Sequence, residues 1–274
     1  VGLGDAVVVT DPEFPPLLDR LDLAGARTLA VAMDDEGPIV EQLAAAVDQE
    51  PVAFFLQPRA QNPTGGGISE TRAAELGAVL AGTPVIVIED DHSGSVAGAP
   101  LVSLGQHCPG QVVHIRSFSK SHGPDLRLAA VGGAAAPIDA VTRRRRLGPS
   151  WSSRLLQQLL LSMLDDDRTK ACVADASTEY ARRRRLLADG LTERGVQVTA
   201  GSGFNLWIAV HDEQAALVNL AANGVGAAPG SPFRAGGSTA AGAEDAHLRV
   251  SVGPLAEGHD RVADLLAAAA SAGR

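Results

Sequence analysis

Several residue types are scarce in this sequence of 274 residues, and each scarcity excludes a class of protein. Its two cysteines, Cys108 and Cys172, cannot build a disulfide framework and lack the spacing of metal ligands, which is typical of a reducing compartment. No apolar run reaches the roughly 18 residues of a membrane span, and no stretch resembles a signal peptide. We therefore predict a cytoplasmic protein without a membrane partner.

Positive charge is also scarce, and nearly all of it is arginine. The 23 lysines and arginines face 32 aspartates and glutamates, which gives a net charge of −9. Nucleic-acid-binding domains are normally basic, so we predict that this segment binds no nucleic acid. Two arginine runs, Arg143–Arg146 and Arg182–Arg185, lie in helix-like segments and are expected on solvated faces or at helix ends.

The first half of the chain contains a regular alternation of short apolar runs and helical patterns. The runs are nearly continuous in apolar character, as expected of strands that are covered on both faces. Such βαβ alternation predicts an α/β fold with a mostly parallel sheet, whose functional residues lie at the carboxyl ends of the strands. The predicted strands are 6–10, 28–33, 52–57, 85–90, 112–117 and 127–133, and the predicted helices are 15–23, 39–49 and 69–81.

The second half has a different pattern. Long helical stretches over 139–194, broken at 147–150 and near 165–168, lead into mixed elements. We predict a large domain at 1–150, and linking helices with a small α+β carboxyl-terminal domain at 151–274. The large domain is expected to be incomplete at its N-terminus, because the chain has no initiator Met and enters almost directly into a strand pattern. The later elements are strand patterns within 196–210 and 247–252, a helix at 213–223, a Gly/Pro-rich loop at 224–243 and a closing helix from Glu257.

Two strand ends of the first half carry polar side chains that could form a site. Asn62 lies in the segment QNPTGG, for which a simple turn is the plain alternative. The run VIVIEDD ends in Glu89, Asp90 and Asp91 and is followed by His92. These acidic residues could cap a helix or bind a metal ion, but no matching cluster elsewhere in the sequence supports a metal site.

One of only two lysines follows another strand end. Ser117, Ser119 and Lys120 come at and just after the strand predicted at 112–117, and Arg127 comes seven residues after Lys120. Two hydroxyls, a guanidinium and loop amides would make a phosphate cradle. The amine of a lysine can add to an aldehyde and form a Schiff base, which a guanidinium cannot usefully do. A solvated loop lysine is the alternative.

An arginine also lies inside an apolar strand pattern near the end of the chain. Arg249 is flanked by Leu248 and Val250. It should either point to solvent or bind a carboxylate through both of its outer nitrogen atoms, and strand alternation does not decide between the two.

In their order and spacing these segments resemble the aminotransferase class I/II family, the fold-type I enzymes that use pyridoxal 5′-phosphate. The resemblance is greatest to the aminotransferase-like domain of MocR/GntR-type regulators. It implies a three-layer large domain with a mostly parallel sheet, and a homodimer. The segments that carry it are DPEFPP (11–16), PRAQNPTGG (58–66), IEDDHSG (88–94), SFSKSHGPDLRLA (117–129) and LRVSVG (248–253).

The resemblance also implies catalytic roles and contacts to the cofactor ring. Lys120 would bind the cofactor as a Schiff base and then carry a proton between substrate and cofactor. Asp90 would face the pyridine nitrogen, Asn62 would donate to the phenolic oxygen, and Phe14 would stack on the ring. His92 stands where relatives have a tyrosine, and its titration near neutral pH would make the cofactor spectrum depend on pH.

Further residues would bind the phosphate and the substrate. The phosphate would lie against Ser117, Ser119 and Arg127, and the α-carboxylate of the substrate against Arg249 and Asn62. The family's glycine-rich phosphate-binding segment is expected upstream of the sequence. A DNA-binding domain would also lie there if the parent protein is a regulator.

The leading hypothesis is therefore a pyridoxal-phosphate-dependent aminotransferase that interconverts an amino acid and a 2-oxo acid. An alternative is the effector-sensing domain of a MocR-type transcriptional regulator, which binds the cofactor without turnover. A third possibility within the same fold is a lyase, a decarboxylase or an acyl-transferring synthase.

Overall fold

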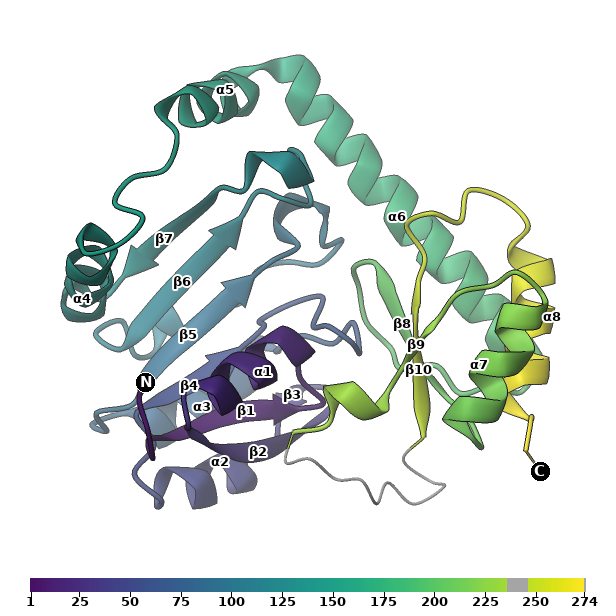
Figure 1. Ribbon diagram of the computed structural model, residues 1–274, viewed down its shortest axis with the longest axis horizontal. Helices are drawn as coiled ribbons and strands as arrows, with labels where there is room; N and C mark the ends of the chain where they lie inside the picture. Colours follow the sequence, from purple (N-terminus) through teal and green to yellow (C-terminus); the bar gives the residue numbers. More distant parts are fainter. Residues whose placement is uncertain (236–245, 274) are drawn as a thin grey trace.

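Two β-sheets organise the computed structural model, which describes residues 1–235 and 246–273 (Figure 1). The large sheet has seven strands in the order β3-β2-β1-β4-β5-β6-β7, and the small sheet has three in the order β8-β10-β9. Part of the Gly/Pro-rich loop predicted at 224–243 lies outside the described residues. The predicted fold class, α/β with a mostly parallel sheet, is confirmed.

The large sheet is parallel except at its two edges. Strands β2, β1, β4, β5 and β6 run in the same direction, while β3 and β7 pair antiparallel with their neighbours. Since β2 lies on one side of β1 and β4 on the other, the strand order reverses beside β1, which is where open α/β sheets form a binding crevice. The strands are β1 (Ala6–Asp11), β2 (Arg27–Asp34), β3 (Gly37–Pro38), β4 (Ala53–Leu56), β5 (Ile86–Asp91), β6 (Val112–Ser117) and β7 (Ala129–Gly133).

Helices cover both faces of this sheet at its β1 end. Helix α1 (Pro15–Leu23) packs on the face that carries Val7 and Val9. Helices α2 (Val40–Val47) and α3 (Glu70–Leu80) pack on the opposite face, which carries Val8 and Phe54 (Figure 1). The alternation of β1 residues between two apolar cores explains why its sequence is apolar throughout, and this end of the sheet has three layers.

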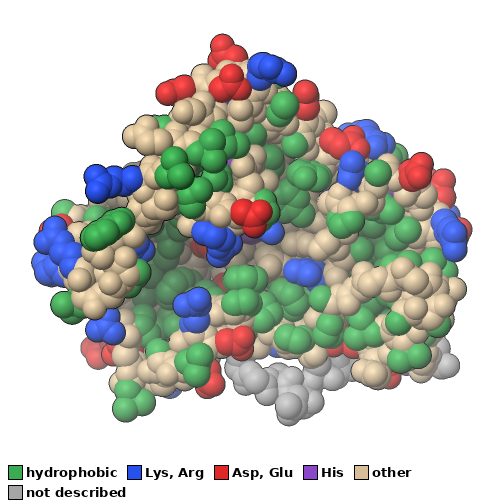
Figure 2. Space-filling view, turned by 45° about the horizontal axis from the view of Figure 1, so that its top comes forward, with side chains coloured by type: hydrophobic (Ala, Val, Ile, Leu, Met, Phe, Trp, Pro, Cys, Tyr) green, Lys and Arg blue, Asp and Glu red, His purple; other side chains and the backbone are tan. Residues whose placement is uncertain are grey.

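The front face of the sheet is open at its β7 end. Every residue of β7 is exposed, and helix α4 (Ala135–Arg146) buries none of its residues. Helix α5 (Arg154–Asp165) leaves Leu155 79% exposed, and Trp151 just before it is 73% exposed. Hydrophobic side chains gather beside a hollow in this face (Figure 2). An apolar surface of this kind is typical of an interface.

Helix α6 (Asp167–Glu193) runs from α5 to the small sheet (Figure 1). The expectation of a solvated arginine run is wrong for Arg184, which is only 8% exposed. Its guanidinium donates to the carbonyl oxygens of Thr199 (3.0 Å) and Asn205 (3.2 Å), so this arginine fastens the helix to the start of the small sheet.

The small sheet is antiparallel and forms its own core with α6, α7 and α8. Leu187, Leu206, Ile208 and Leu248 are buried in this core. No helix in the described part of the chain is both long and apolar enough to cross a membrane. The elements are β8 (Asn205–Ala209), β9 (Ala228–Pro229), β10 (His247–Ser251), α7 (Glu213–Ala222) and α8 (His259–Ala270), and the short 3-10 helices of the chain are η1 (Gly94–Val96), η2 (Leu104–Gln106), η3 (Pro124–Leu126) and η4 (Ser231–Phe233).

Candidate active site

A cavity of about 480 Å³ lies between the carboxyl ends of the large-sheet strands and the small sheet. It forms at the crevice beside β1, where the strand order reverses. Residues from five separate segments that the sequence singled out meet there. They are Phe14, Asn62, Asp90, His92, Lys120 and Arg249.

The parallel strands explain this convergence. Phe14 follows β1, Asn62 lies in the turn after β4, Asp90 is the next-to-last residue of β5 and Lys120 lies in the loop after β6. Because carboxyl ends of parallel strands share one edge of the sheet, residues distant in sequence become neighbours. Arg249 lines the same cavity from β10 of the small sheet, and its part in binding a carboxylate stays a prediction.

Asp90 carries a carboxylate that lines the cavity. It makes no hydrogen bond or ion pair with the residues that the structure describes. Burial, reinforced by the charge of Asp91, raises the pKa of Asp90 to about 6. A carboxylate held in this state favours a cationic ligand that would restore its charge.

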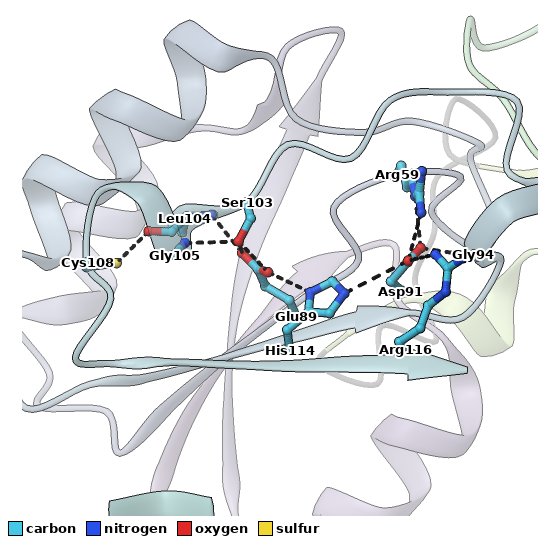
Figure 3. Close-up of polar contacts among 10 residues, drawn as sticks. All are labelled: Arg59, Glu89, Asp91, Gly94, Ser103, Leu104, Gly105, Cys108, His114 and Arg116. Atoms are coloured by element: carbon cyan, nitrogen blue, oxygen red, sulfur yellow. Dashed lines mark hydrogen bonds and ion pairs between the residues drawn. The ribbon is translucent and has the colours of Figure 1, made fainter. Parts of the chain in front are cut away.

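The neighbouring carboxylates have the opposite environment (Figure 3). Asp91 accepts from Arg59 Nε (2.9 Å) and Nη2 (2.8 Å), and also from Arg116. Burial alone would raise the pKa of Asp91, but the two arginines outweigh it and lower this pKa to about 2. Glu89 contacts Nδ1 of His114 at 2.9 Å. Since strand residues alternate between faces, these groups lie behind β5 and Asp90 lies in front.

His92 has one nitrogen atom that lacks a partner. Its Nε2 contacts Ser93 Oγ at 2.9 Å, while its buried Nδ1 makes no hydrogen bond in the described structure. Burial lowers the pKa of His92 to about 4, so the ring is neutral at neutral pH. The expected titration of His92 near neutrality is therefore wrong, and a neutral ring with a free nitrogen suits a hydrogen bond to a ligand instead.

Arg249 likewise has a buried Nε atom without a described partner. Its guanidinium lies 5.7 Å from the centre of the Phe233 ring. Burial lowers the pKa of Arg249 from its ordinary value. A partly buried guanidinium of this kind favours an anionic partner, and a carboxylate matches its planar geometry.

Lys120 is exposed and makes no hydrogen bond or ion pair with described residues. Ser117 ends β6, Ser119 and Arg127 lie in the segment between β6 and β7, and none of the three lines the cavity. The backbone nitrogen of Ser119 donates to Ser117 Oγ at 3.3 Å, and Arg127 is exposed with a left-handed φ of 49°. The part of these three residues in a phosphate cradle therefore stays a prediction.

The cavity also contains residues that the sequence reasoning missed. Gln57, Tyr180, Phe204, Asn205 and Ser251 line it. Asn205 had the same signal as Arg249, a polar residue inside an apolar strand pattern, and Tyr180 is the only tyrosine of the chain. Gln57 and Ser251 lie at strand ends but have no such signal.

Comparisons with known proteins agree with this geometry. The chain matches the family of aminotransferase class I and II over residues 2–266. It is 37% identical over 223 residues to the vitamin B6 salvage pathway transcriptional repressor PtsJ of Salmonella typhimurium, covering 81% of this chain and 52% of that protein. It is 30% identical over 246 residues to the HTH-type transcriptional regulator TauR of Rhodobacter capsulatus, covering 85% of this chain and 49% of that protein.

Solved structures show the same fold. The α-aminoadipate aminotransferase LysN of Thermus thermophilus matches with a TM-score of 0.86 and 23% identity, over 98% of this chain and 72% of that one. The chain therefore belongs to the aminotransferase class I and II family, as the resemblance predicted. It spans about half the length of the curated relatives that it matches.

Proposed function

We propose that the chain is the core of a pyridoxal-phosphate-dependent aminotransferase, which transfers an amino group between an amino acid and a 2-oxo acid. One observation carries the proposal. Asp90, Lys120 and Arg249 bring a carboxylate, an amine and a guanidinium into one cavity. Among the described residues the first two have no partner, and neither has the Nε atom of Arg249. LysN, which shares the fold, is described in complex with N-(5′-phosphopyridoxyl)-L-leucine.

The residues of the cavity fit the cofactor group by group. Asp90 would pair with the protonated pyridine nitrogen, and Phe14 would pack on the ring face. Asn62 and the free nitrogen of His92 would bind the phenolic oxygen. Ser117, Ser119 and Arg127 would bind the phosphate from the loop that carries Lys120.

Pyridoxal phosphate would supply an aldehyde and a ring that accepts electrons. Lys120 would bind that aldehyde through its amine, and after displacement it would move a proton at the substrate α-carbon. Arg249 would orient the α-carboxylate of the substrate, assisted by Asn62. The low pKa of His92 would keep its ring neutral while this proton moves.

A single-turnover experiment tests the proposal. The full-length protein, loaded with pyridoxal phosphate, is mixed with a panel of amino acids, and 2-oxo acid is quantified. We expect about one equivalent of 2-oxo acid per site with a suitable amino acid. Arg249→Ala should lose this product while still binding the cofactor, because in this proposal Arg249 would contact the substrate and not the cofactor. A loaded protein that yields no 2-oxo acid with any amino acid would contradict an aminotransferase.

A second candidate function is the effector-sensing domain of a transcriptional regulator. It is favoured by the relatives PtsJ and TauR, which are regulators and match more than 80% of this chain. PtsJ is named as a repressor of vitamin B6 salvage, so the effector would be the cofactor itself or an amine that reacts with it. In the same experiment this candidate predicts cofactor binding without release of 2-oxo acid.

We further propose that the chain acts as a cytoplasmic homodimer with domains at 1–150 and 151–274. The exposed apolar residues of α5 and the uncovered face of β7 support a second copy as partner, because surfaces of this kind are typical of interfaces. Sedimentation of the full-length protein tests the dimer, which a monomer at micromolar concentration would contradict.

A further inference from the structure

We propose that Asn205 is a positioning residue, which fixes the amide of Asn62 so that its nitrogen faces the cavity. This inference rests on the proposed function, in which Asn62 donates a hydrogen bond to the phenolic oxygen of the cofactor. Asn205 lies on β8 of the small sheet, and Asn62 lies in the turn that follows β4 of the large sheet. The pair therefore joins the two sheets at the cofactor contact.

The direction of the hydrogen bonds determines how the Asn62 amide lies. Asn205 Nδ2 donates to Asn62 Oδ1 at 3.3 Å, and Ser251 Oγ donates to Asn205 Oδ1 at 2.9 Å. Both asparagines are only 8% exposed. Because the oxygen of Asn62 is already used as an acceptor, its Nδ2 remains as a donor toward the cavity. The acceptor that would satisfy this donor is an oxygen of the ligand.

The backbone of Asn62 is fixed from the large sheet. Gln57 Oε1 accepts from the backbone nitrogen of Asn62 at 2.7 Å. Gln57 Nε2 in turn contacts the buried Glu13 Oε1 at 3.4 Å. The large sheet thus holds the main chain of Asn62, while the small sheet sets its side chain.

The loop before β8 sits directly on the turn that contains Asn62. The backbone nitrogen of Ser202 donates to the Gly65 carbonyl at 2.7 Å. A Cβ atom at Gly201 would lie 2.2 Å from that same oxygen, so a side chain at this position would separate the loop from the turn. Arg184 Nε holds the Asn205 carbonyl at 3.2 Å. A shift of the small sheet would therefore move Asn205 and release the Asn62 amide.

The pH titration of the bound cofactor's absorbance tests this role. A hydrogen bond to the phenolic oxygen stabilises its deprotonated form, so Asn62→Ala should raise the midpoint by about one pH unit. Asn205→Ala should raise the midpoint in the same direction and by less. The matched control is Asn223→Ala, which removes an exposed asparagine at the end of α7 and should titrate as wild type.

A double-mutant cycle separates positioning from a merely structural role. In the Asn62→Ala background, Asn205→Ala should cause no further shift, because Asn205 acts through Asn62. An unchanged midpoint in Asn205→Ala, or a shift that simply adds to that of Asn62→Ala, would overturn the proposal. If Asn205→Ala does not fold, Ser251→Ala is the substitute, because it removes the hydrogen bond to Asn205 Oδ1. It should shift the midpoint by less than Asn205→Ala would. In the Asn62→Ala background it should cause no shift.

The same experiment distinguishes this inference from the proposed function. A wild-type protein that binds no pyridoxal phosphate contradicts the proposed function, and the role of Asn205 with it. A wild-type protein that binds the cofactor and titrates, while Asn205→Ala titrates identically, contradicts only the role of Asn205.

Discussion

Asp90 and Asp91 are neighbours on β5, yet they have opposite environments. Asp91 lies behind the strand between Arg59 and Arg116, and its pKa falls to about 2. Asp90 lies in front, without a partner among the described residues, and burial raises its pKa to about 6. A paired buried carboxylate serves the fold, whereas an unpaired one in a cavity is available to a ligand. Adjacent residues of β5 thus carry a paired carboxylate and one without a partner among the described residues.

The largest expected effect is on the reaction, and it concerns Asp90 alone. Asp90→Asn removes the charge that would stabilise the protonated cofactor ring, so we expect single-turnover formation of 2-oxo acid to slow about 10²- to 10³-fold. Rapid-quench measurement on the loaded full-length protein checks this. An Asp90→Asn protein that reacts at the wild-type rate would show that Asp90 has no role in the reaction.

The next effect is on stability, and it concerns Asp91. Asp91→Asn leaves Arg59 and Arg116 without their anionic partner, so the free energy of unfolding should fall by about 3 kcal/mol. Urea unfolding of the cofactor-free protein at neutral pH measures this, with Asp90→Asn as the matched control. Equal stability of wild type and Asp91→Asn would show that the paired carboxylate does not serve the fold.

The pH dependence of stability should separate the two carboxylates further. The folded-state pKa of Asp90 is raised to about 6. The free-energy cost of burying its ionised carboxylate therefore grows as the pH rises from about 4 through about 6. In the cofactor-free protein, the free energy of unfolding of Asp90→Asn should therefore equal that of wild type near pH 4. Above pH 7 it should be higher than that of wild type by about 1 kcal/mol.

The pH dependence of stability has the opposite sign for Asp91. Its folded-state pKa is lowered, so the stability that it contributes is present above pH 4 and is lost as the pH falls toward about 2. Unfolding of both variants across this range measures the two dependences. A stability difference for Asp90→Asn that does not change with pH would contradict the raised pKa.

The smallest expected effect concerns His114, which lies between the two rear carboxylates. Its Nδ1 contacts Glu89 at 2.9 Å, and its Nε2 lies 3.9 Å from Asp91 (Figure 3). His114→Gln keeps a hydrogen-bonding group of similar reach, so the free energy of unfolding should fall by only about 0.5 kcal/mol. Calorimetry of the cofactor-free protein tests this, and cofactor affinity should stay unchanged because His114 does not line the cavity.

Most of the fold could be predicted from the sequence, because buried parallel strands leave continuous apolar runs. The apolar run that ends in Asp90 and Asp91 became β5 within one residue at each end. The environment of Arg184 was not predictable, since a run of four arginines gives no sign that one of them is buried against β8. That outcome depends on the packing of α6, which no local pattern encodes.

The candidate site was predictable where residues follow strand ends, and less so where two sheets meet. Asn62, Asp90 and Lys120 all lie at or just after the carboxyl ends of parallel strands, so topology alone brings them together. Asn205 reaches the cavity only because the small sheet lies beside the carboxyl ends of the large-sheet strands (Figure 1). Its contact with Asn62 spans 143 residues of sequence and leaves no local signal.

The attachment point of the cofactor tests the central claim most directly. The full-length protein is incubated with pyridoxal phosphate, reduced with borohydride and mapped by peptide mass spectrometry. The chain offers a matched pair, because Lys120 and Lys170 are its only lysines. We predict that the label lies on Lys120, that it is absent in Lys120→Ala and that it is unchanged in Lys170→Ala. A wild-type protein without label on Lys120, or a Lys120→Ala protein labelled as strongly as wild type, would contradict the claim.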